Sequence, residues 1–515
     1  MTNPSVRLRR LASLLMLAVA LGCAPDAEPD ASEPGAGDAL AALPAPMRPE
    51  PGSARPRVVL LISIDTLRAD HLGVYGYLRP TSPVIDGLAR EGIVFADASS
   101  TAPWTLPAHA SMLSGLYPHR HGATDVTHQL PEDVPTLATI LARRGYRTAA
   151  VVNSTKVSRL YDLSRGFQEF LYVPEVHDRI SPSTWITDQA MDWLREFRDE
   201  RLFLFVHYYD VHSDYASLPR YERQFVRPYD GKVDGSSAQL DMTRHDSEIM
   251  EMCRANPEHA FCRNWSRVRV VEFDEVDRQH LIDLYDAGIR QMDAELGRLV
   301  LLLRAEGLLD ECLLILTSDH GEEFLEHGGL LHNLTQYQEM LHVPLILRGP
   351  GIPAGMRIET PVSLVDLAPT VLGALGEAPP ILLDGLDLSP LWRSASESTR
   401  SEPEGGALYR NRFLFAEADF NRAATNNVVQ AVRRGRYKLH RDRLTGKVEL
   451  YDLETDPGEQ ADVSDRHPEV VEELLAALHG RGSGAPEGER VELSSEAIEQ
   501  LKALGYYLPP TVDAP

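Results

Sequence analysis

The sequence predicts an α/β fold built around a central, mostly parallel sheet. Short, continuous apolar runs recur along its 515 residues, as strands covered on both faces require. These runs span 58–64, 148–152, 202–206, 313–316 and 344–347. Helical patterns alternate with them, at 83–91, 136–144, 187–199 and 276–306. Strands that alternate with helices favour a sheet with helices on both of its faces.

Residues 213–271 interrupt this alternation. The segment is polar and highly charged, and it contains Cys253 and Cys262. We expect it to be an insertion over one edge of the sheet, within a main domain that spans 57–393. The two cysteines are the natural pair if a disulfide forms, but four cysteines in the whole chain are too few for a disulfide scaffold.

A second region follows a link at 394–406 that is rich in Ser, Glu and Gly. Beyond the link come shorter β-like runs and one helical pattern, at 412–417, 427–432, 437–441, 448–453 and 468–479. The β-like runs precede the helix and do not alternate with further helices. This order predicts a small C-terminal α+β subdomain over 407–510.

The N-terminus resembles a bacterial lipoprotein signal. Arginines precede an apolar run from Leu11 to Leu21, which is shorter than the roughly 20 apolar residues that cross a bilayer. The run ends in Ala20-Leu-Gly-Cys23, which is similar to the processing box whose cysteine is lipidated. We therefore expect a signal peptide over 1–23 and a lipid anchor on Cys23. The alternative is an ordinary cleaved signal with an incidental cysteine.

The residues after Cys23 connect this anchor to the folded part. Ala24, rather than aspartate, points to the outer membrane of a Gram-negative cell. The stretch 24–56 is mostly Ala, Pro, Gly and acidic residues, which cannot bury enough surface to offset their ordering entropy, so we expect a flexible tether. A net charge of −25 argues against nucleic acid as a partner. It does not exclude a small anionic substrate, because a bound metal reverses the field locally.

Candidate chemistry lies where two apolar runs end. Asp65 follows the first run directly, and Asp319 and His320 follow the run at 313–316. In parallel sheets, ligands bind beyond the carboxyl ends of the strands. Two carboxylates and a histidine there suit one divalent cation, either Mn, Mg, Ca or Zn. Taken separately, Asp65 or the Asp319-His320 pair fits a helix cap as well.

The segment 102–115 adds a hydroxyl group. Pro107 suits the first turn of a helix that ends at Gly115, which places Thr105 near the helix start. Free N–H groups and the helix dipole favour an anion there. A plain N-cap is the alternative role for Thr105. Beside a cation held by the two aspartates and the histidine, its hydroxyl pKa would fall and make it a nucleophile at neutral pH.

Four ordered motifs resemble those of the sulfatase family, within the alkaline-phosphatase superfamily. Thr105-Leu-Pro-Ala-His-Ala-Ser-Met-Leu-Ser-Gly115 is similar to the Cys-x-Pro-Ser-Arg signature, and Asp210-Val-His212 is similar to the histidine motif on the substrate side. Ser318-Asp-His-Gly-Glu322 is similar to the metal-binding signature. Glu449-Leu-Tyr-Asp-Leu-Glu-Thr-Asp-Pro457 is similar to the C-terminal hallmark. The resemblance extends from Arg57 to about Leu504. It implies an alkaline-phosphatase-like sandwich, with a catalytic domain over 57–393.

The resemblance also implies a role for each site residue. One cation would be held by Asp65, Asp319, His320 and Thr105, and Thr105 would be the nucleophile. His212 and His332 would protonate the leaving group or hold the free oxygens. His109, Asn153 and His332 would contact the substrate. His207, which ends another apolar run, we expect to serve packing.

Several positions depart from the family pattern. Dedicated sulfatases oxidise a Cys or Ser to formylglycine, and Thr105 cannot give that aldehyde because its extra methyl group would leave a ketone. His109 replaces the signature arginine, Thr66 replaces the second of two paired aspartates, and Asn153-Ser-Thr155 replaces the usual Lys-x-His. No formylglycine is therefore expected. The site resembles superfamily members that use an unmodified threonine to attack phosphorus.

Together these features predict a metal-dependent hydrolase of sulfate or phosphate-type esters, with phosphodiester or phosphonate chemistry favoured. The substrate is expected to be a small or polymeric anionic ester. The expected location is the cell envelope, facing the periplasm, with the lipid anchor as the only contact with the membrane. A true sulfuric ester hydrolase of the arylsulfatase kind and a non-catalytic surface binding lipoprotein are the alternatives.

Overall fold

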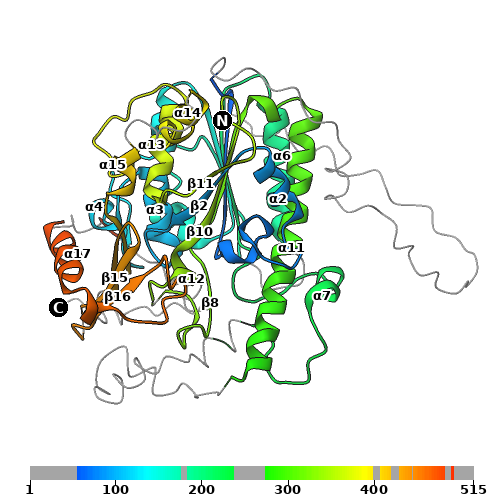
Figure 1. The fold of residues 1–515 in the computed structure, drawn as a ribbon. Coiled ribbons are helices and arrows are strands. Elements are labelled where there is room, and N and C mark those ends of the chain that lie inside the picture. Colours follow the sequence, from blue (N-terminus) through cyan, green and yellow to red (C-terminus); the bar gives the residue numbers. More distant parts are fainter. Residues whose placement is uncertain are drawn as a thin grey trace, which may run out of the picture.

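The computed structural model describes residues 55–175, 182–236, 240, 273–333, 335–397, 406–418, 429–443, 445–481 and 489–491. Figure 1 shows a large sheet with helices on both sides and a smaller sheet beside it. This arrangement confirms the predicted α/β fold and its additional small α+β part.

The large sheet has nine strands in the order β11-β2-β10-β7-β1-β6-β4-β5, and β12 also pairs with β2. Its strands are β1 (Val58–Ile64), β2 (Ile93–Ser99), β4 (Arg147–Val152), β5 (Glu169–Tyr172), β6 (Leu202–Tyr208), β7 (Cys312–Thr317), β10 (His342–Arg348), β11 (Met356–Ile358) and β12 (Val362–Ser363). β10 is antiparallel to β7 and to β2, whereas the other pairs are parallel. All five predicted strands are present, which confirms the mostly parallel sheet.

Alternate residues of β1 enter two separate cores, one on each face of the sheet. Val59 and Leu61 pack with α3 (Thr105–Ser114), α5 (Leu137–Arg143) and α13 (Leu367–Ala374). Leu60 and Ile62 pack with α2 (Pro83–Arg90), α6 (Pro182–Glu196) and α11 (Glu275–Ala305). Both faces of the strand are therefore buried, which explains why its sequence is continuously apolar.

The four predicted helices are present as α2, α5, α6 and α11, and side chains cap the starts of α5 and α11. Asp274 caps α11 by accepting from the N–H groups of Val276 and Asp277. α6 begins at Pro182 rather than at the predicted residue 187. The earlier start is physically reasonable, because proline is favoured in the first helical turn.

The segment predicted as an insertion is described only at its start. There, α7 (Pro219–Phe225) packs Tyr221 and Phe225 against Ala287 of α11. Cys253, Cys262 and the predicted signal peptide with Cys23 lie outside the described residues, as does the predicted tether except for residues 55 and 56. Among the described residues, no helix is both long and apolar enough to cross a membrane.

The smaller sheet is an antiparallel meander of β13 (Leu414–Ala418), β14 (Val429–Arg434), β15 (Tyr437–Asp442) and β16 (Val448–Asp452). Helix α17 (Pro468–Gly480) covers one face with Leu474 and Leu478. The remaining short elements are β3 (His128–Gln129), β8 (Glu323–Phe324), β9 (Leu330–Leu331), β17 (Glu489–Arg490), α4 (Pro118–His121), α12 (Gln338–Leu341), α14 (Pro390–Glu397) and α15 (Gly406–Arg410).

Candidate active site

Two neighbouring strands bring the predicted metal ligands together. β1 and β7 pair in parallel, with Ser63 opposite Thr317, so their carboxyl ends lie side by side. Asp65 follows β1, and Asp319 and His320 follow β7. One ligand atom of each of these three residues lies within 4.8 Å of the others, and all three side chains are fully buried. Three of the four predicted ligands are thus close enough to one another to bind the same ion.

The turn after β1 is strained in a way that orients Asp319. Thr66 has a φ of 57°, a left-handed conformation that is rare and costly for a β-branched residue. Its carbonyl accepts from the hydroxyl of Tyr285 at 2.7 Å, and its N–H donates to Oδ1 of Asp319 at 3.2 Å. The N–H of His320 donates to the same Oδ1 at 2.9 Å. Oδ2 of Asp319 faces the cluster formed by Asp65, Asp319 and His320, and it lies 3.4 Å from Nε2 of His320.

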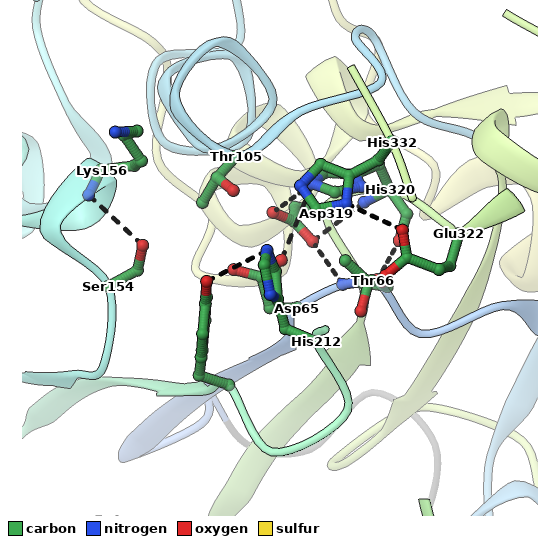
Figure 2. Close-up of polar contacts among 12 residues, drawn as sticks. Asp65, Thr66, Thr105, Ser154, Lys156, His212, Asp319, His320, Glu322 and His332 are labelled. Carbon is green, nitrogen blue, oxygen red and sulfur yellow. Dashed lines mark hydrogen bonds and ion pairs between the residues drawn. The ribbon is translucent and has the colours of Figure 1, made fainter. Parts of the chain in front are cut away.

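Thr105 is the first residue of α3 and not its cap. The N-cap position belongs to Trp104, which has extended backbone angles, and among the described residues no side chain caps this helix. The N-cap alternative for Thr105 is therefore wrong. Figure 2 shows its hydroxyl directed at the carboxylates of Asp65 and Asp319. The helix dipole favours negative charge on an oxygen at this position.

The buried ligand atoms find no hydrogen-bond partner in the described part of the chain. They are both carboxylate oxygens of Asp65, Oδ2 of Asp319, Nε2 of His320 and Oγ1 of Thr105. Burial raises the pKa of Asp65 to about 7, although His320 acts in the opposite direction. Such unpaired buried groups are costly, and a divalent cation among them would remove that cost. The donor set of oxygens and one imidazole fits Mn, Mg, Ca or Zn.

The tautomer of His320 also fits a metal ligand. Its Nδ1 donates to the carbonyl of Gly321 at 2.9 Å, which leaves the lone pair on Nε2. That Nε2 faces the cluster, 3.7 Å from Oδ1 of Asp65. Hydrogen bonds of this kind fix the ring of a ligating histidine and raise its basicity.

His207 lies against the cluster, which corrects the expectation that it serves packing alone. The backbone N–H of Asn153 donates to its Nδ1 at 3.4 Å, so its proton is on Nε2. That Nε2 lies 3.3 Å from Oδ2 of Asp65. Burial lowers the pKa of His207 to about 4, which keeps the ring neutral. His207 therefore lines the ligand cluster beside Asp65, without a hydrogen bond to it among the described residues.

His109 lies beside the cluster, with Nδ1 3.5 Å from Oδ2 of Asp319, but both of its ring nitrogens have partners within the fold. Nδ1 donates to the carbonyl of Thr105 at 2.8 Å, and Nε2 accepts from the hydroxyl of Ser63 at 3.0 Å. Burial lowers the pKa of His109 to about 4, so the ring is neutral and does not replace the positive charge of the signature arginine. Both nitrogens are engaged within the fold, which makes His109 a support for the start of α3.

Asn153 has a structural role as well, and the turn after β4 carries a buried lysine beside α3. The amide of Asn153 donates to the carbonyls of Val173 and Pro174, at 2.8 and 3.1 Å. Lys156, which the sequence analysis does not single out, is carried on a short turn that packs against α3 (Figure 2). Burial lowers the pKa of Lys156 to about 7, with Glu175 opposing that shift.

His212 and His332 lie together beside the ligands, as Figure 2 shows. Their ring centroids are 4.7 Å apart, and the ring of His332 is 4.8 Å from that of His320. Nδ1 of His332 is 2.8 Å from Oε1 of Glu322, and Nε2 of His212 is 3.1 Å from the hydroxyl of Tyr209. His332 is therefore next to a predicted ligand, and His212 is next to His332. Glu322 is part of the motif Ser318-Asp-His-Gly-Glu322, but its contact with His332 could not be predicted from the sequence.

The backbone on both sides of His332 is unusual. Leu331 and Asn333 have φ angles of 68° and 95°, in the region that side chains other than glycine rarely adopt. The N–H of Asn333 donates to the carbonyl of Pro103 at 3.1 Å, two residues before Thr105. The strained segment is thus tied to the loop that carries Thr105, a pattern typical of functional sites.

The mostly parallel sheet therefore carries a buried cluster of Asp65, Asp319 and His320 at its carboxyl edge. A family model described as Sulfatase matches residues 57–377, and one described as N-sulphoglucosamine sulphohydrolase, C-terminal, matches residues 326–481. This chain belongs to the sulfatase family.

Curated relatives agree with this assignment. Arylsulfatase K of Bos taurus is 27% identical over 425 residues, which cover 76% of this chain and 75% of the relative. Arylsulfatase K of Homo sapiens is 27% identical over 430 residues, which cover 77% of each chain. Sulfatase-family members such as these are ester hydrolases, and this chain is therefore an enzyme of that class.

Solved structures share the fold. BT4656, in complex with its substrate D-glucosamine-2-N,6-O-disulfate, has a TM-score of 0.67 at 20% identity, covering 86% of this chain and all of the other. Phosphonate monoester hydrolase of Agrobacterium radiobacter has a TM-score of 0.66 at 24% identity, covering 83% and 96%. At these identities the likeness establishes the fold alone. Among the proteins with this fold, one binds a sulfated substrate and another is a phosphonate monoester hydrolase.

Proposed function

We propose that this sulfatase-family hydrolase cleaves phosphodiesters or phosphonate esters, with unmodified Thr105 as its nucleophile. The position of Thr105 carries the proposal. It is the first residue of α3, and its hydroxyl is directed at Asp65 and Asp319 (Figure 2). A threonine cannot become formylglycine, but its hydroxyl can form a covalent ester with phosphorus that water then cleaves.

Four residues would hold the divalent cation: Asp65, Asp319, His320 and Thr105. When bound, the cation supplies positive charge that lowers the hydroxyl pKa of Thr105 and offsets the charge of the substrate. The first N–H groups of α3 have no partner within the helix, so they add hydrogen bonds to the free oxygens of the substrate. Donors of this kind contribute about 3 kcal/mol each to transition-state stabilisation.

The reaction proceeds in two displacements. Oγ1 of Thr105 attacks phosphorus in line with the leaving oxygen, and the Thr–O–P bond forms as the bond to that oxygen breaks. Burial holds the pKa of His212 well below its usual range, so its ring starts neutral. His212 or His332 takes the proton that leaves Oγ1 of Thr105 and passes it to the departing oxygen. Water then attacks phosphorus and loses a proton to the same histidine, the Thr–O–P bond breaks, and that proton passes to Oγ1 of Thr105.

Sulfate ester hydrolysis is the second candidate. The matching family model, the relatives named arylsulfatase K and the structure with a disulfated glucosamine all favour it. Against it stands the nucleophile, because Thr105 gives no aldehyde hydrate. The described surroundings of Thr105 also lack the family's arginine, since His109 occupies that position as a neutral ring.

A substrate panel separates these candidates. Aryl phosphodiester, phosphonate monoester and sulfate ester substrates with the same aryl leaving group are compared, with added Mn²⁺, Mg²⁺, Ca²⁺ or Zn²⁺ and with a chelator. We expect metal-dependent turnover of the phosphodiester or phosphonate, with kcat/KM for the sulfate ester lower by at least about tenfold, a difference of 1.4 kcal/mol in barrier. A clear preference for the sulfate ester would show that the second candidate is right.

We also propose that the enzyme acts on an anionic ester in the cell envelope, held there by lipid on Cys23. The apolar run that ends in Ala20-Leu-Gly-Cys23 supports this proposal. Replacing Cys23 by serine is expected to move the protein from the membrane fraction to the soluble periplasm. kcat/KM should be retained, because Cys23 precedes the first described residue by a long polar stretch. Continued labelling of the variant by a radioactive or alkyne fatty acid would refute the anchor.

A further inference from the structure

Glu459, in the turn after β16, makes a set of buried contacts that a surface turn does not need. It is 1% exposed, and its φ of 52° is in the left-handed region. Its carboxylate accepts from Nζ of Lys438 at 3.2 Å and from Nε2 of His440 at 2.8 Å. Burial would raise the pKa of Glu459, but Lys438 and His440 lower it to about 2, so the carboxylate is ionised.

The same carboxylate reaches across to the large domain. Oε2 of Glu459 accepts from the backbone N–H of Gln338 at 2.6 Å, and Gln338 is the first residue of α12. The carbonyl of Glu459 lies 3.0 Å from Nε2 of His327, whose Nδ1 is paired with Glu339 of α12. The ring of Tyr337, just before α12, is stacked on that of His327 at 3.6 Å. Glu459 thus fixes the start of α12 from two directions.

Helix α12 in turn packs against the loop after β7, which carries Asp319 and His320. The carbonyl of Met340 accepts from the N–H of Gly321 at 2.8 Å. The carbonyl of Glu339 comes so close to Gly321 that a Cβ there would lie 1.9 Å from it. The carbonyl of Gly321 is the acceptor that sets the tautomer of His320. Gly321 therefore transmits the position of α12 to a predicted ligand.

A second connection runs to the other ligand of this loop. The carbonyl of Leu341, the last residue of α12, accepts from the N–H of Ser100 at 2.8 Å. The hydroxyl of Ser100 is hydrogen-bonded to the carbonyl of Asp319. Met340 and Leu341 also form an apolar cluster with Ala416 and Ala431 of the smaller sheet, and Figure 1 shows α12 on that side of the large sheet. Both ligands from β7 therefore depend on where α12 lies.

We propose that Glu459 is a positioning residue for the cation site, acting through α12 on the loop that carries Asp319 and His320. The inference rests on the metal site of the proposed function, but not on the nucleophile or on the substrate. It assigns the C-terminal sheet a role in holding the ligands at the geometry the cation needs. Removing a group that hydrogen-bonds a metal ligand directly typically changes metal affinity by about 10- to 100-fold. Glu459 acts on such a group through α12, so we expect an effect at the lower end of that range.

Glu459→Ala tests this assignment in the full-length protein. Mn²⁺ binding is measured by calorimetry without substrate, and turnover is measured as a function of Mn²⁺ concentration. We expect Mn²⁺ affinity to fall by at least about tenfold, while kcat at saturating Mn²⁺ stays within a few-fold of the parent. Glu454→Ala is the matched control, because Glu454 lies in the same turn and is 67% exposed, paired only with Arg436 among the ion pairs of the described chain.

Gln338→Pro tests the same contact from the other side. It removes the N–H donated to Glu459, together with the side-chain oxygen that accepts from Nζ of Lys438 at 3.2 Å, and proline is favoured at the first helical position. Tyr337 before it already has φ and ψ of −69° and 171°, which a following proline accepts. The fold should therefore persist, and Mn²⁺ affinity should fall as in Glu459→Ala.

Three outcomes decide the matter. Weakened Mn²⁺ binding in both variants, with Glu454→Ala like the parent, supports the assignment. Parental Mn²⁺ affinity in Gln338→Pro and in folded Glu459→Ala overturns it while the proposed function stands. A parent protein that binds no divalent cation overturns the metal site itself, and this inference with it.

Discussion

Thr105→Ala is expected to lower turnover by at least about 10³-fold, because it removes the atom that forms the bond to phosphorus. The helix should be little affected, since the N-cap of α3 is Trp104 and no capping hydrogen bond is lost. Steady-state kinetics with the best ester of the panel, together with thermal unfolding, measure both effects. Thr105→Ser keeps the hydroxyl and should retain measurable activity.

Ser111→Ala is the matched control for this experiment. Ser111 lies on the same helix, is fully buried, and its hydroxyl is 3.1 Å from Nε2 of His121, away from the cluster. Losing that hydroxyl should change turnover little, whereas losing Thr105 should be severe. If Thr105→Ala is folded and binds Mn²⁺ but turns over substrate near the parental rate, Thr105 is not the nucleophile.

Asp319→Asn is expected to have an effect of similar size through the cation. The amide keeps the shape of the side chain, and its oxygen can still accept from the N–H groups of Thr66 and His320 at the place of Oδ1. The charge that faces the cation is lost, so Mn²⁺ affinity should fall by at least about 100-fold and turnover by at least about 10³-fold. Calorimetry with Mn²⁺ and kinetics at several Mn²⁺ concentrations check both numbers.

Thermal unfolding of Asp319→Asn, with and without Mn²⁺, is an independent test of the ligand role of Asp319. Burial, followed by the negative charge of Asp65, raises the pKa of Asp319, so the metal-free parent keeps two carboxylates in an unfavourable place. Without metal, Asp319→Asn should therefore be at least as stable as the parent. Added Mn²⁺ should raise Tm for the parent but not for the variant, because only the parent binds it in the folded state. Equal Mn²⁺ stabilisation of both proteins would contradict the ligand role of Asp319.

The sheet and the positions of the three protein ligands could be predicted from sequence because both follow from local rules. A strand buried on both faces is continuously apolar, and the residue after it lies at the edge where ligands bind. Asp65 and Asp319 could thus be placed 254 positions apart in sequence and still expected to meet; the structure has them within 4.8 Å. The antiparallel direction of β10 was not predictable, because a strand buried on both faces is continuously apolar whichever way it runs in the sheet.

The surroundings of the ligands depend on side-chain directions that no local pattern gives. His109 occupies the arginine position of the family signature, yet its ring points back to Thr105 and Ser63. His207 looked like a packing residue at a strand end, but the pairing of β1 with β6 sets it against Asp65. Lys156 and Glu322 likewise become visible only when neighbouring turns are brought together.

The covalent step is tested most directly by mass spectrometry of the peptide that contains Thr105. The parent enzyme is mixed with Mn²⁺ and a slow phosphonate ester, quenched in acid within one turnover, digested and sequenced by fragmentation. The mechanism predicts a phosphonyl group on Thr105 that appears before product release and is absent from Thr105→Ala. A peptide that stays unmodified while the first equivalent of leaving group is released, or a phosphonyl group on another residue, would contradict it.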